Sequence, residues 1–411
     1  MACQVLRCYI RYVNMIRSHC SGRTCYSVRV NQKPQPPPEL SEKELHGWNL
    51  VRRFQAVLAP ALSGRVLEKS EQDPRRTLAA MDYFSLLLFA LFNPVIGTLR
   101  GLVKASELDR VRKEVGSDHR VSLASFSEAQ HLFDPELLRG VIGTLHGKAS
   151  ALGGDERLHR LGKELVAVDG TLFSTLPRMS WALRTDYVKR GAKLHVKFSA
   201  LREATVDAIL TPGKVCERKV LRSMLKAGEL YVADGYYGRD YKLLDELVAH
   251  GCDYVLRLSD NASYVVEEEL PLSAADRAAG ILWDGWVKLG ERGVRVRLLR
   301  VKAFDNTELL LATNRGDLEA DLVGLIYRHR WCIETFFKWI KCILGCRHLL
   351  LESPEGVASQ LYCACIIALL FTIALGRKPT KRQWELIQFH LMGWATFEEL
   401  TAGLGLEQKP A

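Results

Sequence analysis

The sequence lacks the long apolar run that a membrane-spanning helix needs. Such a helix takes about 20 consecutive apolar residues. The apolar segment at residues 83–92 stops at Asn93 and Pro94, and the one at residues 361–371 is short and rich in cysteine and alanine. We therefore expect two buried core helices, the second covering one side of a sheet, and no membrane partner.

A disulfide framework and a clear zinc motif are also missing. Cys3, Cys8, Cys20 and Cys25 form C-x4-C-x11-C-x4-C, which faintly resembles a zinc ribbon, but its x4 spacing is loose. The 11 cysteines are an odd number scattered through apolar segments. The pairs Cys342/Cys346 and Cys363/Cys365 have no second pair at the spacing of a zinc site. Small buried hydrophobic residues account for them better. The pattern predicts free thiols in a reducing, cytoplasmic compartment.

Acidic residues are absent from residues 1–38, which contain six Lys and Arg residues and end in a proline-rich stretch. This composition predicts a basic arm and a stiff linker; a transit peptide or an over-extended translation start are alternatives. Over the whole chain, 57 Lys+Arg against 47 Asp+Glu give a net charge of +10. That balance favours a polyanionic partner.

Residues 39–155 have the pattern of a small all-α domain. Capping boxes are predicted at Ser41 with Glu44 and at Ser125 with Glu128, and a helix start at Asp134 and Pro135. Basic and acidic residues alternate closely over residues 99–120, which fits either a solvated helix face or a DNA-facing one.

From Glu164 onward the pattern changes to short strands and helices. Two apolar runs lead directly into an aspartate, Asp169 and Asp234. The order of three strands, helix, strand, helix, strand is that of an RNase H-like mixed sheet, an α/β fold that we assign to residues 160–350. The predicted strands are 165–168, 194–198, 204–210, 230–233 and 254–258, with helices at 220–227 and 241–250.

The stretch 327–341 predicts a helix with two chemically different faces. At about 100° per residue, its polar residues fall within an arc of about 80°. Ordinary ion pairs between Arg330, Glu334 and Lys338, each stabilising the helix by a few tenths of a kcal/mol, are the simpler interpretation. The aspartates upstream favour a site. The polar face consists of Tyr327, Arg330, Glu334, Lys338 and Lys341.

The spacing Tyr327-x2-Arg330-x3-Glu334-x6-Lys341 resembles the YREK signature of DDE transposases from bacterial insertion sequences, in particular insertion-sequence family four. The resemblance covers residues 120–375. In the resembling family the region that corresponds to residues 99–120 binds the terminal inverted repeats, which implies that residues 39–155 are a helical DNA-binding domain. It implies that Glu334 is the third metal-binding carboxylate of an RNase H-like core. It also implies that Tyr327, Arg330 and Lys341 contact the transposon end, and Lys338 on the same face is a further candidate.

A second strand in this family carries a Lys and a His that point toward DNA or the scissile phosphate. Lys193 and His195 resemble that pair, although His195 also fits a core histidine. One departure concerns the second aspartate. The family often has Arg directly after it, whereas this chain has Gly235. This difference removes an expected cation but leaves the metal ligand intact.

Three carboxylates suit the chemistry of cutting and joining phosphodiesters. Two divalent ions about 3.5–4 Å apart stabilise the attacking and leaving oxygens. Mg²⁺ is held by one or two carboxylates per ion, with Mn²⁺ as an expected substitute. Asp169 would bridge the two ions, with Asp234 on one and Glu334 on the other. No Ser-His-Asp, Walker or zincin pattern competes with this interpretation.

The 99 residues between Asp234 and Glu334 exceed what a bare RNase H core needs. They predict a β-rich insertion at residues 262–315, in which Trp283 or Trp286 is a candidate for stacking a flipped base or simply for packing. Helices at 383–391 and 396–402, within a C-terminal region of residues 351–411, are candidates for supporting a homodimer in the synaptic complex.

The combined prediction is a nucleoid-associated bacterial transposase acting on double-stranded DNA. It would bind the terminal inverted repeats of its element, nick them with Mg²⁺ and join the 3′-hydroxyl to target DNA. Two alternatives are a catalytically silent, domesticated DNA-binding protein and a nuclease of RNase H fold. The first has no evident reason to keep all three carboxylates, and the second does not need Tyr327, Arg330 and Lys341.

Overall fold

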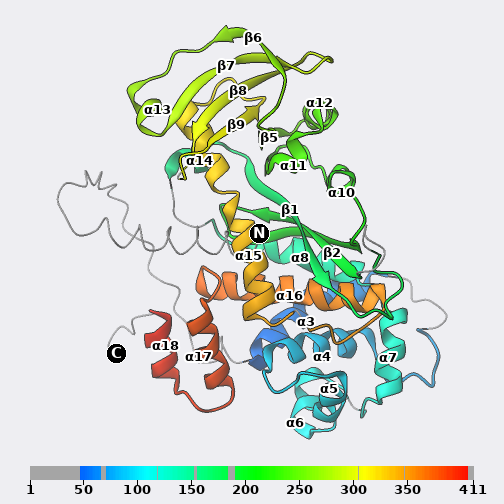
Figure 1. Ribbon diagram of the computed structural model, residues 1–411. Coiled ribbons are helices and arrows are strands. Elements are labelled where there is room, and N and C mark those ends of the chain that lie inside the picture. Colours follow the sequence, from blue (N-terminus) through cyan, green and yellow to red (C-terminus); the bar gives the residue numbers. More distant parts are fainter. Residues whose placement is uncertain are drawn as a thin grey trace. The chain divides into compact units, whose positions relative to one another are not determined.

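The computed structural model describes residues 47–65, 71–117, 119–151, 155–183, 190–303, 305–346 and 348–405 (Figure 1). The chain divides into two compact units, residues 1–37 and 38–411, and the fold described below belongs to the second. The predicted basic arm and linker at residues 1–38 and the predicted capping box at Ser41 lie outside the described residues.

A nine-stranded mixed sheet forms the centre of this unit, with the order β3-β2-β1-β4-β5-β9-β8-β7-β6. Strand β1 pairs antiparallel with β2 and parallel with β4, and β4 pairs parallel with β5. The predicted mixed α/β class is therefore confirmed. The first five strands are β1 (Glu164–Ser174), β2 (Gly191–Ser199), β3 (Ala204–Pro212), β4 (Glu229–Ala233) and β5 (Asp253–Arg257).

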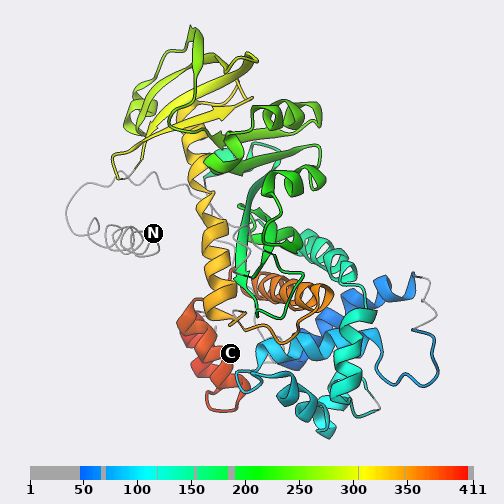
Figure 2. The same cartoon turned by 45° about the vertical axis from the view of Figure 1, so that its right-hand side comes forward.

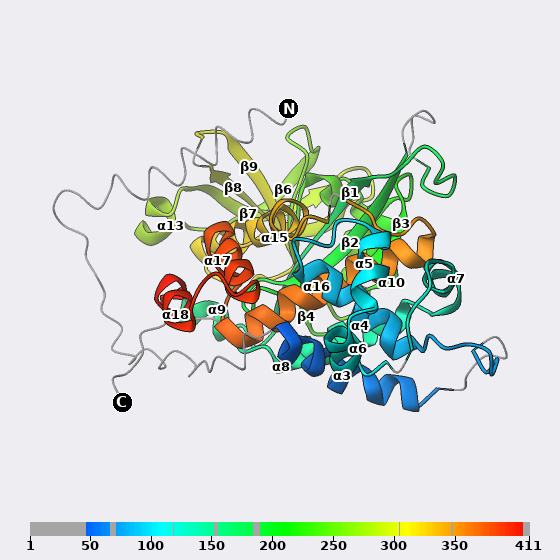
Figure 3. The ribbon, with the colours of Figure 1, turned by 90° about the horizontal axis from the view of Figure 1, so that it is seen from below.

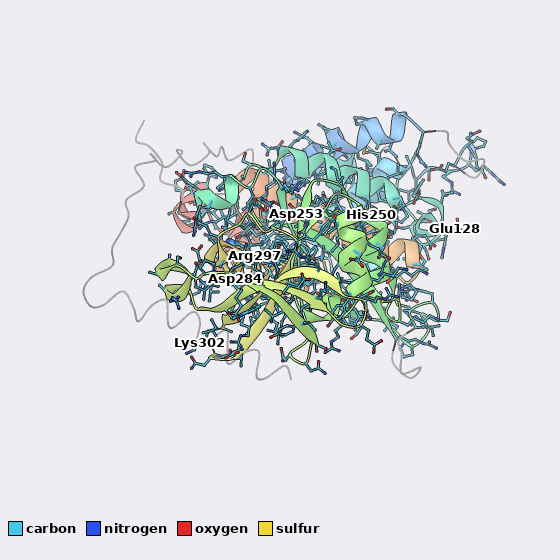
Figure 4. The ribbon with its side chains drawn as sticks, turned by 90° about the horizontal axis from the view of Figure 1, so that it is seen from above. Glu128, His250, Asp253, Asp284, Arg297 and Lys302 are labelled. Atoms are coloured by element: carbon cyan, nitrogen blue, oxygen red, sulfur yellow. The ribbon has the colours of Figure 1, made fainter. Side chains whose placement is uncertain are left out.

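Four strands lie between β5 and helix α14 (Ala320–Arg328), where the sequence predicted a β-rich insertion. They continue the same sheet, because β9 pairs antiparallel with β5. Inside this extension Arg297 and Asp284, on neighbouring strands, form a buried ion pair (Figure 4). The elements are β6 (Tyr264–Glu269), α13 (Ala274–Ala278), β7 (Ile281–Leu289), β8 (Val294–Lys302) and β9 (Glu308–Thr313).

The helices that precede the sheet share its core and do not enclose a separate one. Phe54 and Tyr83 belong to the same hydrophobic cluster as Phe198 of β2. Helix α7 begins at Ser122, whose side chain accepts the Ser125 N–H, so the capping box predicted at Ser125 is wrong: Ser125 already lies inside the helix. The helices are α3 (Gly47–Ser63), α4 (Ala80–Phe92), α5 (Leu99–Ser106), α6 (Asp109–Val115), α7 (Leu123–Leu132), α8 (Glu136–Lys148) and α9 (Glu156–His159).

Helix α16 (Pro354–Leu375) packs against α4, α8 and β3 (Figure 3). Its 22 residues exceed the predicted length, because Ser353 caps it and Pro354 starts it well before the apolar run. In the described part of the chain it alone is long and apolar enough to cross a membrane. Its residues are buried along its length, however, and a buried core helix can be equally long and apolar.

The opposite face of the sheet carries α10 (Glu217–Ser223), α11 (Gly235–Gly238) and α12 (Tyr241–Ala249), which pack on Val166 and Val168 of β1. On the α16 side, the chain leaves the insertion through α14, α15 (Trp331–Lys338) and the π-helix η1 (Trp339–Ile343), which follow one another along the sheet (Figure 2). Two helices with capping boxes, α17 (Lys381–Leu391) and α18 (Phe397–Leu404), end the described chain.

Candidate active site

The first two predicted carboxylates lie where β1 and β4 separate. The two strands pair from Glu164 with Glu229 to Ala167 with Val232. Asp169 and Asp234 each follow two residues after this last pair, so they lie at the same end of the two strands. Strand β1 continues to Ser174, so Asp169 lies within a strand and does not end it as the sequence suggested. Beyond Ala167 β4 no longer covers β1, which leaves the two aspartates at an open strand end.

Asp234 also begins the next element. Its Oδ1 accepts the Tyr236 N–H at 2.9 Å, which caps the short helix α11. Helix capping by aspartate satisfies a backbone donor that otherwise lacks a partner. One carboxylate oxygen of Asp234 is therefore tied to the backbone.

Glu334 reaches this region from α15, which contacts β1. The uninterrupted helix predicted over residues 327–341 is wrong: α14 ends at Arg328, α15 runs from Trp331 to Lys338, and a π-helical turn follows. The extra residue that a π-turn accommodates rotates Lys341 relative to Glu334. Lys341 then donates to Thr171 Oγ1 at 2.6 Å, two residues from Asp169 on β1.

Glu334 is only partly satisfied by its surroundings. Arg330 Nη1 donates to Glu334 Oε1 at 2.6 Å, so the i,i+4 ion pair of the simpler interpretation is formed. Glu334 Oε2 and Arg330 Nε are buried, and in the described part of the chain neither has a hydrogen-bond partner. The Arg330 guanidinium lies 5.7 Å from the Tyr327 ring and 5.4 Å from the Trp331 ring.

The three carboxylates share one electrostatic environment. Burial raises the pKa of Asp169 to about 7, and the charges of Asp234, Glu217 and Glu334 add to the shift. Burial also raises the pKa of Glu334, with Arg330 opposing it and Asp234 adding to it. Mutual repulsion among carboxylates is relieved by a bound cation.

The donor set suits a hard divalent cation, because all three groups offer oxygen and one buried oxygen of Glu334 is unpaired. The spacing is wider than a coordination sphere. Across the described ranges, no three His, Cys, Asp or Glu side chains are close enough to hold a metal ion together. The chain thus gathers the carboxylates into one charge cluster in which Glu334 is bound to Arg330.

The predicted DNA-contacting residues of this segment differ in exposure. Lys338 is exposed, and Lys341 is half-buried beside β1. Arg330 is more deeply placed, with 12 % of its side chain exposed. Tyr327 is buried in the core below it. The predicted polar face therefore does not face solvent as a whole, because its N-terminal part packs into the protein.

Lys193 and His195 lie on the other face of the sheet from Asp169. In the antiparallel register His195 is paired with Gly170, so its side chain points away from the face that carries Asp169. His195 is buried, and its Nε2 is 2.9 Å from Thr211 Oγ1. Lys193 forms an ion pair with Glu217 at 3.0 Å. The structure does not support a DNA contact for either residue, and His195 agrees with the core-histidine alternative.

Two charged residues near the carboxylates escaped the sequence analysis. Glu217 begins α10 and acts electrostatically on Asp169. Arg257, at the end of β5, places its Cγ and Cδ 3.8 Å from where a Gly235 side chain would begin, and it pairs with Asp260 at 3.0 Å. The aliphatic part of Arg257 thus lies beside the position where the family's arginine is missing, while its guanidinium binds Asp260. The position of Arg257 at the end of a predicted strand could have identified it from the sequence. No local sequence pattern identifies Glu217.

Comparisons with known proteins identify the family of this chain. A family model described as "Transposase DDE domain" matches residues 160–370, more than half of the chain. The chain is 26% identical over 216 residues to a probable transposase for insertion sequence element IS5377 from Geobacillus stearothermophilus, covering 51% of this chain and 56% of that protein. It is 25% identical over 228 residues to the putative transposase y4zB from Sinorhizobium fredii, covering 54% and 64%.

These matches span less than two thirds of either relative. Among solved structures, a cryo-EM structure of the piggyBac transposase synaptic complex with hairpin DNA aligns with 88% of this chain and 84% of that one, at 9% identity and a TM-score of 0.38. That likeness is too distant to bear on the site. The family match, which includes Asp169, Asp234 and Glu334, establishes that the chain belongs to the transposase DDE domain family.

Proposed function

We propose that this protein is the transposase of a bacterial insertion sequence and that it cuts and joins DNA with Asp169, Asp234 and Glu334. The observation that carries the proposal is that Asp169 and Asp234 lie at the same end of the neighbouring strands β1 and β4, with Glu334 of α15 in the same charge cluster. The strand order β3-β2-β1-β4-β5 supports an RNase H-like core, and the residue spacing supports the YREK group.

The three carboxylates would hold two Mg²⁺ ions, or Mn²⁺ in their place. When bound, the metal polarises the scissile phosphate and activates the attacking oxygen. Asp169 and Asp234 project from neighbouring strands, which fixes their relative position. Glu334 lies on a helix and shares its carboxylate with Arg330. Phosphate approaching Arg330 would compete for its guanidinium and release Glu334 Oε1 for the site.

Double-stranded DNA, both transposon ends and target, is the proposed partner, and the net charge of +10 supports it. Lys338, Lys341 and Arg330 remain the proposed contacts, and Lys193 and His195 are left out. A homodimer that pairs two ends and a nucleoid-associated, cytoplasmic location complete the proposal. All three carboxylates are present, which favours an active enzyme over a silent derivative.

A plasmid cleavage assay tests the proposal. The substrate carries the inverted repeats that flank the gene, and Asp234→Asn is compared with Glu268→Gln, which alters an exposed carboxylate on β6. We expect Asp234→Asn to abolish cleavage while end binding persists in a gel shift, and Glu268→Gln to behave like the wild type. Cleavage by Asp234→Asn at the wild-type rate would refute the site. Cleavage without dependence on the repeats would favour a nuclease.

A further inference from the structure

A fourth acidic residue packs against β1 on the face opposite Asp169. Helix α10 contacts both β1 and β2, and Glu217 is its first residue. A Cβ atom placed on Gly170 would lie 2.9 Å from the Glu217 carboxyl carbon. The Glu217 carboxyl group therefore rests directly on the backbone beside Asp169. Any larger residue at position 170 would have to displace it.

Two partners hold this carboxyl group in place. Lys193 Nζ lies 3.0 Å from Glu217 Oε1 and also donates to the Val215 carbonyl at 3.2 Å. The hydroxyl of Tyr237, a buried residue, donates to Glu217 Oε2 at 3.5 Å. Only 13 % of the Lys193 side chain and 17 % of the Glu217 side chain are exposed. Ion pairs with additional hydrogen bonds have a defined geometry, so both charges stay at fixed positions relative to β1.

The Glu217 charge lies next to Asp169 along β1. Its carboxyl group rests on Gly170, the residue after Asp169, and little solvent reaches the Lys193–Glu217 pair to screen it. The electrostatic potential at Asp169 therefore depends on a residue on the other face of the sheet.

We propose that Glu217 is a positioning residue for the divalent-cation site: it fixes the β1 backbone at Gly170 and supplies negative potential that favours a cation at Asp169. Lys193 opposes that potential, so the pair sets how tightly the metal is held. This inference rests on the proposed function, and it gives Lys193 a role that does not involve DNA.

The charge-neutral variants Glu217→Gln and Lys193→Met separate this role from a purely structural one. Mn²⁺ binding to the full chain without DNA is measured at pH 8 from the electron paramagnetic resonance signal of free Mn²⁺. Both variants break the same ion pair, but they change the local charge in opposite directions. We expect Glu217→Gln to weaken binding by about three- to ten-fold and Lys193→Met to strengthen it by a similar factor.

A matched control is Glu246→Gln, which breaks the pair with Arg222 on the same face of the sheet and should leave Mn²⁺ binding unchanged. A shift of Glu217→Gln and Lys193→Met in the same direction, or no shift in either, would overturn the inference. Thermal unfolding without metal checks the fold, and if Glu217→Gln does not fold, the direction of the Lys193→Met shift decides.

Asp234→Asn separates failure of the inference from failure of the proposed function. If wild-type Mn²⁺ binding does not depend on Asp234, the proposed metal site itself is refuted. If binding depends on Asp234 but Glu217→Gln binds like the wild type, only the role of Glu217 is refuted.

Discussion

Two ion pairs of this protein have similar chemistry and very different surroundings. In the insertion, Arg297 binds both oxygens of Asp284, at 2.9 and 2.6 Å, and also donates to the carbonyls of Arg315 and Leu318. The side chains are 5 % and 2 % exposed. At the carboxylate cluster, Arg330 makes one bond to Glu334, and these side chains are 12 % and 32 % exposed.

The two pairs differ in whether their buried polar atoms all have hydrogen-bond partners. The charged groups of Arg297 and Asp284 bond to each other, and Arg297 also bonds to backbone carbonyls, as expected of buried charges with a structural role. The Arg330–Glu334 pair keeps a buried carboxylate oxygen and a guanidinium N–H without partners in the described chain. Unsatisfied groups of this kind cost stability and remain available to a ligand. Breaking the Arg297–Asp284 pair should therefore mainly lower stability, whereas breaking the Arg330–Glu334 pair should mainly lower activity.

Replacement of Glu334 should have the largest effect on activity. Glu334→Gln keeps the shape of the side chain but removes the charge that would bind metal. We expect strand cleavage in the plasmid assay to fall by about a thousand-fold or more, equivalent to about 4 kcal/mol. The thermal unfolding midpoint should stay near the wild-type value. Activity within ten-fold of the wild type would place Glu334 outside the metal site.

Replacement of Asp284 should have the largest effect on stability. Asp284→Asn leaves the Arg297 charge buried without its counter-ion, which should lower the free energy of unfolding by about 3–5 kcal/mol. Glu267→Gln is the matched control, because Glu267 pairs with Lys288 and Arg295 while 27 % of its side chain is exposed. Its replacement should cost much less, because water screens this pair. If urea denaturation gave equal losses of unfolding free energy for Asp284→Asn and Glu267→Gln, burial would not distinguish the two kinds of ion pair.

His195 is a third incompletely satisfied group, because its Nδ1 has no partner within the described ranges. Burial, and then the charge of Lys193, lower its pKa from 6.5 to about 4. The unfolded chain therefore takes up this proton at higher pH than the folded one. Stability from the neutral ring is fully present above pH 6.5 and is lost as the pH falls toward 4.

As the pH falls through this window, the wild type should lose about 2 kcal/mol more of its unfolding free energy than His195→Gln does. Glutamine can still bond to Thr211 but does not titrate in this range. The measurement is urea denaturation at several pH values between about 4.5 and 7.5. Parallel profiles for variant and wild type would show that His195 does not carry the pH dependence.

The smallest expected effect concerns Lys341, whose ammonium group donates to Thr171 on β1. If Lys341 also contacts a DNA phosphate, Lys341→Ala should lower the slope of log affinity against log salt by about one. Lys381→Ala on α17, with 72 % of its side chain exposed, is the control and should keep the wild-type slope. An unchanged slope for Lys341→Ala would remove it from the DNA contacts.

Sequence patterns singled out the candidate carboxylates because each depends on a local signal. Asp169 and Asp234 follow apolar runs, and parallel pairing of those runs brings the two residues to the same end of neighbouring strands. The mixed α/β class followed from the same runs. Helical periodicity was a weaker guide, since it continued across residues 329–330, where the structure has a turn between α14 and α15.

Features that depend on tertiary packing were not predictable in this way. Alternation along β2 puts Lys193 and His195 on one face, but nothing local says that α10 covers this face while Asp169 is on the other. Glu217 is a second example: it precedes the helix predicted at residues 220–227, and only the fold places it on Gly170. Residues 39–155 were predicted to form a separate domain. The sequence does not show that their helices pack with α16 and the sheet in one hydrophobic cluster.

The central claim is that Asp169, Asp234 and Glu334 meet around bound metal, and iron-directed cleavage of the polypeptide tests it most directly. Fe²⁺ exchanged into the site, with ascorbate and peroxide, generates hydroxyl radicals that cut nearby backbone. We predict fragments that end close to residues 169, 234 and 334, all suppressed by excess Mg²⁺ and by Asp234→Asn. Cuts near residues 169 and 234 without any near residue 334 would contradict the claim.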